Sequence, residues 1–328
     1  MQTKRIYLSL FCVLCGAISA SAQTESTSVF NFLTLPTSSH AMALGGTNIS
    51  LPDDDASLIF QNPALMANVS DKSLNFSFLS YMQGCKAGNA SWVMSHGSRG
   101  SWGIGAQFIN YGTMREVSVE GLDSGQFSAL DMALSGGYAY LLSEYIVGGV
   151  MGKFIYSKYG TYTSMALAVD LGFNYFDEDN GFSASLVAAN VGGQVKAFGN
   201  TYERLPMDLR LGFTKTLENA PIRFSVTLVD LTRWKDSDYY SSTGSVSNGR
   251  IFTNHFQLGV DILPSDVFYL SAGYSFRRAY ELTAAGAAHG AGLSFGAGLQ
   301  LKKFSIGLSY AKYHVSMPAF MISAQYHL

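Results

Sequence analysis

The sequence is poor in charged residues for its length. Lys, Arg, Asp and Glu make up 13% of the 328 residues, about half of the roughly 25% that is usual in soluble domains. Beyond the N-terminus it also lacks an apolar run of about 18 residues, the minimum for a membrane-spanning helix. Aromatic residues nevertheless reach 13%, and there are 34 glycines. Such a chain can cross lipid only as a closed β-barrel, because lipid offers no water to unpaired backbone groups.

The N-terminus has the features of an export signal. Lys4 and Arg5 precede an apolar run at residues 6–18, and the Ala-Ser-Ala sequence at residues 20–22 fits a small-residue cleavage site. Residues 1–22 are therefore predicted to be a signal peptide that is removed on export. A short buried helix is the alternative interpretation.

Cleavage would change both the charge and the cysteine content. It removes two basic residues and no acid, and leaves 19 basic and 23 acidic residues with a formal net charge of −4. This balance disfavours nucleic acid as a partner, because nucleic-acid binding needs a basic face. Cleavage also removes Cys12 and Cys15 and leaves Cys85 alone. The mature chain can then form neither an intramolecular disulfide nor a cysteine-based metal site.

From Lys72 onward, large apolar residues recur at every second position, which is the pattern of a strand with two different faces. The residues between them are mainly Gly, Ala and Ser with isolated charges, as in 130–142, 167–175 and 293–301. A soluble two-sheet protein would also alternate, but its polar face would meet water and carry Lys and Glu. Large apolar side chains outside and small ones inside favour a barrel in lipid.

The alternation predicts about 14 strands, an even number as in single-chain bacterial barrels. Their predicted starts lie near Ser73, Ala87, Ser101, Ser128, Tyr145, Thr161, Phe182, Leu205, Pro221, Ile251, Asp266, His289, Phe304 and Pro318. Short turns alternate with longer connections, the longest at residues 112–127, 192–204 and 233–250. Because such barrels have short periplasmic turns and long external loops, both termini are predicted to face the periplasm. The fold class is thus an all-β transmembrane antiparallel barrel.

Residues 23–70 do not follow the alternation. They contain three prolines and the acidic run at residues 53–55, but they are too apolar for a disordered segment. The small inward residues of the strands leave room inside the barrel. We therefore expect residues 23–70 to fold as a plug in the lumen or against its periplasmic mouth, and residues 71–328 to form the barrel.

Two segments match hydrolase motifs. Residues 292–296 fit G-x-S-x-G, which acts on a sharp strand-to-helix turn, and residues 309–312 fit S-x-x-K, which needs a helix to bring Ser and Lys to one face. The alternation places both segments in strands. The sequence therefore predicts no enzyme, no catalytic residues and no cofactor.

Nor is a metal site predicted. The acidic run at residues 53–55 lacks the interleaved spacing and the glycine of a calcium loop, which favours a solvated turn or a cap over a cation site. The six histidines are scattered and form no metal-spaced pair, so surface or interfacial roles are expected for them.

Four charges fall on the inward face of the predicted strands, namely Asp131, Asp170, Asp208 and Arg210. A charge in a dry interior is costly unless it is paired or hydrated. These side chains could line a water path or hold the plug, and we favour the second role.

The loop at residues 233–250 is rich in aromatic residues. Trp234, Tyr239 and Tyr240 are candidates for contact with a protein partner, because aromatic residues are favoured at the centres of interfaces. For Trp234, an aromatic girdle at the membrane surface is the alternative.

Several segments resemble a known family in their order along the chain. They are Phe32–Pro36, Ala41–Asn48, Asp53–Asp55, Gln61–Ala64, Ala189–Gly193 and Leu205–Gly212. Together they resemble the PorV/PorQ family, outer-membrane barrels of the type IX secretion system of Bacteroidetes that are related to the FadL fatty-acid transporters. The segment at residues 44–50 and the acidic run look more like the PorQ branch.

The resemblance implies a 14-stranded, non-catalytic barrel in a surface attachment complex with PorU, PorV and PorZ. That complex removes a sorting signal from secreted cargo and joins the cargo to anionic lipopolysaccharide. The peptidase-like chemistry belongs to PorU, and a PorQ-like barrel would anchor a PorZ-like surface protein in the outer-membrane lipid.

Two functions remain open from the sequence. The first is an anchoring barrel whose external loops hold a surface partner. The second is a FadL-like transporter that passes hydrophobic molecules through the lumen or a lateral opening. The long external loops and a lumen face that is not strongly apolar favour the anchor.

Overall fold

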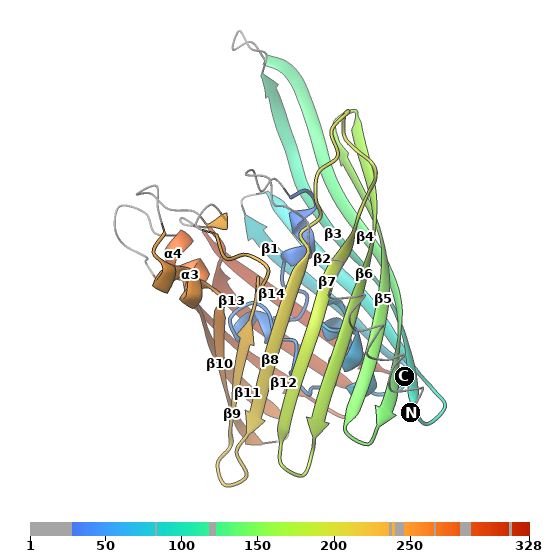
Figure 1. Cartoon of the computed structure of the whole chain (residues 1–328), viewed down its shortest axis with the longest axis vertical. Helices are drawn as coiled ribbons and strands as arrows, with labels where there is room; N and C mark the ends of the chain where they lie inside the picture. The colour runs from blue at the N-terminus through green and yellow to red at the C-terminus, as the bar shows by residue number, and fades with distance from the viewer. Residues whose placement is uncertain are drawn as a thin grey trace, which may run out of the picture.

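The described residues form one closed antiparallel barrel. The computed structural model describes residues 28–82, 84–117, 123–235, 238–239, 246–265, 267–282, 290–314 and 317–328. Fourteen strands pair in sequence order, and β1 pairs with β14 to close the ring (Figure 1). This confirms the predicted fold class.

The strands are β1 (Ser73–Met82), β2 (Cys85–His96), β3 (Gly100–Val117), β4 (Asp123–Ser143), β5 (Ile146–Tyr159), β6 (Tyr162–Asp177), β7 (Phe182–Lys196), β8 (Asp208–Thr216), β9 (Ile222–Leu228), β10 (Phe256–Ser265), β11 (Phe268–Ser275), β12 (Leu293–Gln300), β13 (Phe304–Lys312) and β14 (Pro318–His327). The predicted starts lie within a few residues of these bounds. The largest differences concern β4 and β10.

The predicted loop at residues 112–127 is largely strand. β3 and β4 continue to pair beyond the rest of the barrel, with Thr113 opposite Ser128 and Arg115 opposite Gln126. The resulting hairpin rises furthest from the barrel in Figure 1. β10 begins later than predicted because residues Asn248–Asn254 form a short helix, α3, in the preceding loop. A second short helix, α4 (Phe276–Glu281), follows β11.

The outer surface of the strands is apolar, as the alternation predicted. Exposed side chains include Leu134, Leu167, Phe173 and Phe295, whereas intervening residues such as Ala168 are buried. Burial of these large side chains in lipid stabilises a barrel by removing apolar area from water. None of the helices in the described ranges is long and apolar enough to span a membrane.

The two ends of the barrel differ. Short turns join the strands at one end, where the C-terminus also lies, and the long connections with α3 and α4 lie at the other end (Figure 1). This arrangement follows the predicted alternation of turns and loops. We refer to the end with the long connections as the outer end.

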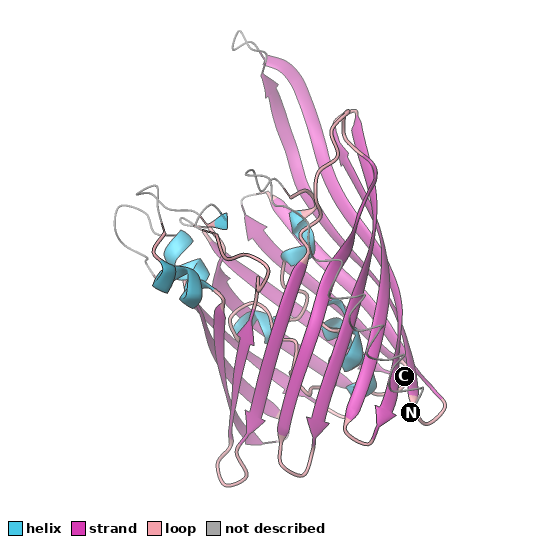
Figure 2. Cartoon of the chain, in the orientation of Figure 1, coloured by secondary structure: helices cyan, strands magenta, loops and turns pink. Residues whose placement is uncertain are grey.

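Residues 28–70, the described part of the predicted plug, lie inside the barrel, and Figure 2 shows their short helices within the ring of strands. These helices are η1 (Asn31–Thr34), α2 (Ser39–Ala43), η2 (Ala56–Phe60) and η3 (Pro63–Asn68). Side-chain oxygens of Ser38, Asp55 and Asn62 cap the last three at their N-termini, which satisfies backbone N–H groups that the helix leaves unpaired. The predicted signal peptide, residues 1–22, and residues 23–27 lie outside the described residues.

The plug packs directly against glycines of the barrel wall. A Cβ at Gly273 would lie 2.3 Å from the backbone nitrogen of Gly45, and one at Gly149 would lie 2.4 Å from that of Ala64. Any larger residue at these two wall positions would collide with the plug backbone. The small inward residues noted in the sequence therefore provide the space that the plug fills.

Candidate functional site

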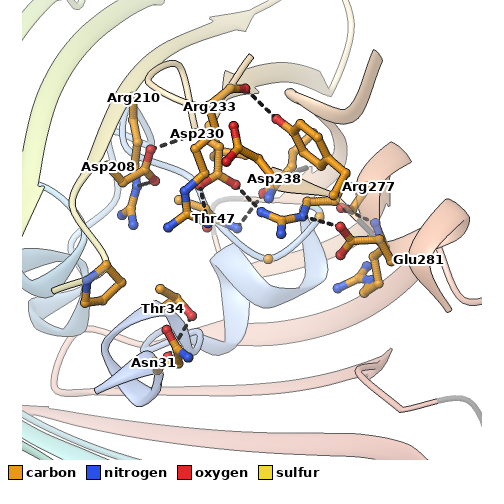
Figure 3. Close-up of a pocket in the computed structure, with 18 of the residues that line it drawn as sticks. Asn31, Thr34, Thr47, Asp208, Arg210, Asp230, Arg233, Asp238, Arg277 and Glu281 are labelled. Atoms are coloured by element: carbon orange, nitrogen blue, oxygen red, sulfur yellow. Dashed lines mark hydrogen bonds and ion pairs between the residues drawn. The ribbon is translucent and has the colours of Figure 1, made fainter. Parts of the chain in front are cut away.

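A cavity of about 720 Å³ lies at the outer end of the barrel, within the range of about 300–1,000 Å³ that is typical of ligand pockets. We call it the outer cavity. Its walls come from the plug, from the strand ends around β8, β10 and β11, and from the loops that contain α3 and α4 (Figure 3). Four arginines and four acidic residues line it: Arg210, Arg233, Arg277, Arg278, Asp208, Asp230, Asp238 and Glu281.

Ion pairs brace the loops around this cavity. Asp230, which follows β9, accepts from Nη1 of Arg277 at 2.5 Å and lies 3.5 Å from Nη1 of Arg233. Nε of Arg277 donates to Glu281 at 3.0 Å. The connection between β9 and β10 is thereby tied to α4, as Figure 3 shows.

Asp208 and Arg210 pair with each other across one residue of β8, with Nε of Arg210 2.5 Å from Asp208 Oδ2. Asp208 also accepts from the backbone nitrogen of Asp230 at 2.7 Å. Both side chains line the outer cavity. They therefore connect the barrel wall to an external loop.

Asp131 and Asp170 have their partners in the barrel wall. Asp131 accepts from the hydroxyls of Tyr111 at 2.7 Å and Tyr159 at 2.9 Å, and also from Ser157. Asp170 pairs with Lys153 at 2.6 Å and accepts from the backbone nitrogen of Asn190 at 2.7 Å.

Within the described residues, the hydrogen bonds and ion pairs of the four predicted inward charges join neighbouring strands or a strand and a loop, and none of them reaches the plug. Adjacent strands lie close enough to supply a donor or a counter-charge on the same face.

Asn190 has a left-handed backbone, with φ of 56°, at an irregularity in the pairing of β6 with β7. Asp170 and Lys153 thus stabilise a local break in the strand register.

Other residues hold the plug. His40 on the plug lies between two carboxylates, with Nδ1 2.6 Å from Asp53 and Nε2 2.8 Å from Asp261. Arg223 on β9 donates to both acids at 2.7 Å. We call these four buried residues the ion cluster. It joins the plug to β9 and β10, where Arg223 and Asp261 face each other in register.

The ion cluster corrects two interpretations from the sequence. His40 is buried and ion-paired, although a surface or interfacial role was expected, and its ring stacks on Tyr269 with centroids 3.9 Å apart. Asp53 is also buried and ion-paired, so it is not part of a solvated turn. Asp55 caps the N-terminus of η2, which agrees with the alternative prediction of a helix cap in the acidic run. The side-chain alternation in β9 and β10 indicates that Arg223 and Asp261 lie on the lumen face. It does not indicate that they meet His40.

Hydroxyl and amide side chains of the wall make further contacts with the plug. Ser294, the serine of the G-x-S-x-G match, lies in β12, where its Oγ donates to Ala43 O at 2.8 Å and accepts from Gly45 N at 3.1 Å. Its hydroxyl is therefore occupied with the plug. Residues 309–312, the S-x-x-K match, lie in β13 and not on a helix. Among the described residues, no group of three or more His, Cys, Asp and Glu side chains could hold a metal.

The aromatic candidates of the outer loop differ in exposure. Trp234 is 52% exposed; its ring lies tilted against that of His255 with centroids 4.2 Å apart, and its Nε1 donates to Leu231 O. Tyr239 is only 6% exposed, and its hydroxyl donates to Arg233 O. Tyr239 thus supports the loop from within, and Tyr240 lies outside the described residues. Partner contact by Trp234, Tyr239 and Tyr240 remains a prediction.

Neither a known protein-family model nor a curated protein sequence matches this chain. Solved structures do match. The Pseudomonas putida toluene transporter TodX is 13% identical with a TM-score of 0.57, over 91% of this chain and 98% of that one. The monoaromatic hydrocarbon channel CymD is 12% identical with a TM-score of 0.56, over 90% and 98%. A Pseudomonas aeruginosa FadL homologue is 11% identical with a TM-score of 0.51, over 88% and 98%.

At these identities the likeness concerns the fold. It supports an outer-membrane type of β-barrel and does not by itself assign a function to this chain.

Proposed function

We propose that this chain is a non-enzymatic outer-membrane barrel that anchors a surface protein at its outer end. In the more specific form of the proposal, the partner is a PorZ-like protein, and the assembly, with PorU and PorV, attaches secreted cargo to lipopolysaccharide. The observation that carries the proposal is the filled lumen, together with the braced loops at its outer end.

The plug is held by contacts that are costly to break. Removing one partner from a buried ion pair leaves an uncompensated charge, at a cost of about 3–5 kcal/mol, and the ion cluster contains four such pairs. Backbone contact at Gly273 and Gly149 leaves no gap at these two points for a passing molecule. These features favour a scaffold over a barrel that opens in each transport cycle.

The outer end has the properties of a docking platform. Arg277 ties the loop after β9 to α4, and Trp234 presents an exposed ring on that braced loop. A rigid loop loses less entropy when it binds a partner, and tryptophan is enriched among residues that dominate binding energy.

The type IX assignment rests on the ordered resemblance described above. The segments that carry it lie in the plug, β7 and the region of β8. His40 immediately precedes the segment Ala41–Asn48, Asp53 begins the acidic run, and Asp208 and Arg210 lie in the segment Leu205–Gly212. The resembling segments therefore contain, or directly adjoin, residues with a structural task in holding the plug or bracing the outer end.

The test is isolation of the tagged full-length protein from its own outer membrane in a mild detergent, followed by identification of co-isolated proteins and lipids. A large surface protein in stoichiometric amount is expected. It should be lost when residues 233–250 are replaced by a Gly-Ser linker. It should be retained when the turn at residues 177–181, at the opposite end of the barrel, is replaced in the same way. Retention in both variants would refute docking at this loop.

Passage of hydrophobic molecules is the second candidate. The comparisons favour it over the anchor, because the matching barrels are named as a toluene transporter, a monoaromatic hydrocarbon channel and a FadL homologue. Against it, the outer cavity is lined by eight charged side chains, which an apolar molecule would have to desolvate. A barrel that is isolated alone, with fatty acid or another lipid inside, would establish this function in place of the anchor.

A further inference from the structure

Arg278 is a buried cation that lacks an acidic partner. It is the third residue of α4 and is 8% exposed. Its Nε donates to Ala291 O at 2.9 Å, and Nη2 donates to Gly292 O at 3.0 Å. No carboxylate of the described residues lies within ion-pair distance, and the neighbouring segment 283–289 contains no acidic residue. Among the described residues, the charge is therefore met by neutral groups only.

A second donor lies beside this guanidinium. Cζ of Arg278 stands 4.9 Å from the ring centroid of Tyr313, and the buried hydroxyl of Tyr313 has no hydrogen-bond partner among the described residues. Both side chains line the outer cavity. A buried hydroxyl without a partner is costly, so a group that accepts its hydrogen bond would stabilise the site.

Gly46 keeps the space between these donors open. Its φ is +121°, which non-glycine residues rarely adopt. A Cβ there would lie 3.1 Å from the hydroxyl oxygen of Tyr313 and 3.8 Å from Nη1 of Arg278. Both donors therefore lie within 4 Å of the position that a Cβ of residue 46 would occupy, and glycine leaves that position unfilled.

We propose that the outer cavity binds a small hydroxylated acid, such as a sugar acid or a sugar phosphate, whose anionic group is held by Arg278 and Tyr313. Arginine favours carboxylates and phosphates because its planar guanidinium offers paired donors, and such charge-assisted hydrogen bonds are the stronger ones. The anion would also compensate the buried charge of Arg278. This binding activity goes beyond the proposed anchoring function and does not depend on it.

The remaining charges of the cavity define the rest of the ligand. Asp208 is paired with Arg210, and Asp230 and Glu281 are paired with Arg277, so these acids do not neutralise Arg278. Asp238 accepts from the backbone nitrogen of Lys235, and no cation in the described ranges lies within ion-pair distance of it, so its carboxylate can accept a hydroxyl donor. A polar lining of this kind fits a hydroxylated molecule better than a hydrocarbon, which would have to desolvate these charges.

The test uses the full-length protein in detergent micelles and calorimetric titration with glucuronate, glucose 6-phosphate and, as the neutral control, glucose. At least one of the two anions should bind about tenfold or more tightly than glucose. Tyr313→Phe should weaken that binding about fivefold to tenfold. The same variant should not lower the thermal midpoint, because the lost hydroxyl has no partner within the protein.

Tyr81→Phe is the matched control, because its ring lies 6.0 Å from that of Tyr313 but does not line the cavity. It should leave binding unchanged.

Arg278→Gln should abolish the preference for the anions over glucose, and Arg278→Lys should restore part of that preference. If neither anion binds with a Kd below about 10 mM, which is already a very weak affinity, the proposed site does not exist. The same conclusion holds if glucose binds as tightly as both anions. Unchanged anion binding by Tyr313→Phe would overturn the assignment of the site to this residue pair.

Discussion

His40 and Asp261 lie 221 positions apart in sequence, yet Nε2 of the imidazole is 2.8 Å from the carboxylate where the plug meets the barrel wall. Asp53 holds the other ring nitrogen at 2.6 Å, so the ring is fixed between an acid of the plug and an acid of β10. Arg223 completes the charge balance with two cations and two anions. This closed arrangement makes His40 the central residue of the contact between plug and wall.

Replacing His40 by Ala should destabilise the folded protein by about 3–5 kcal/mol, because two buried carboxylates would then share one arginine. The measurement is urea unfolding of the refolded protein in micelles. His96→Ala is the control, since His96 is exposed at the end of β2 and its loss should change stability little. Equal midpoints for the two variants would show that the ion cluster does not hold the plug.

Stability should also fall at alkaline pH. Burial alone would lower the pKa of His40, which lies on the plug, but Asp261 and Asp53 outweigh burial and raise that pKa to about 9. Because an unfolded histidine titrates near about 6.5, the stabilisation is fully present below that pH and is lost as the pH rises through about 9.

Unfolding midpoints measured from about pH 6 to pH 10 should therefore decline more in the native protein than in His40→Gln, which has no titrating ring at this position. Parallel pH profiles for the two proteins would contradict a charged His40 in the folded state.

The glycine contacts predict a sharp difference between two similar substitutions. Gly273→Ala places a Cβ 2.3 Å from the plug backbone and should displace the plug or lower stability by about 1–3 kcal/mol, as overpacking does. Gly193→Ala meets nothing within 4 Å and should be close to neutral. Limited proteolysis of the plug and the unfolding midpoint measure both effects. Comparable behaviour of the two variants would contradict the close packing described here.

At the outer end, Trp234→Ala should weaken retention of the proposed surface partner by about 2 kcal/mol or more, the size of an interface hot spot. The barrel itself should remain folded, because the Trp234 ring is half exposed and lies outside the strands. Two quantities are measured for each variant: the amount of partner that is co-isolated, and the heat-modifiable gel migration that shows whether the barrel is folded. Trp102→Ala, on the apolar outer face of β3, controls for a general effect of losing a membrane-facing tryptophan.

The barrel could be predicted from the sequence because each strand carries its own local signal. In segments such as β6 and β12, side-chain alternation indicates both the strand and its lipid-facing side. The plug could be placed by the absence of alternation and by small inward residues. α3 was missed because a seven-residue helix in a polar loop has little apolar periodicity.

The ion cluster could not be predicted in the same way. His40 and Asp261 come together only after the barrel has closed around the plug, and no local pattern records a contact across 221 positions. The roles of Asp131 and Asp170 depend equally on neighbouring strands, since Tyr159 and Lys153 reach them from β5. Burial of Tyr239 beneath its loop is likewise a tertiary effect.

The most direct test of the anchoring role uses a disulfide that fixes the plug to the barrel wall, which we call the locked form. Ser50 of the plug and Thr214 of β8 place their hydroxyl oxygens 2.8 Å apart, so this contact is the position for a Ser50→Cys/Thr214→Cys disulfide in a Cys85→Ser background, with formation of the bond checked first by mass spectrometry. The locked and reduced forms would be compared in cells for surface-partner retention and for uptake of toluene and fatty acid. An anchor predicts full partner retention and no change in uptake when the plug is locked. Uptake that occurs only in the reduced form would contradict the account and identify a transporter.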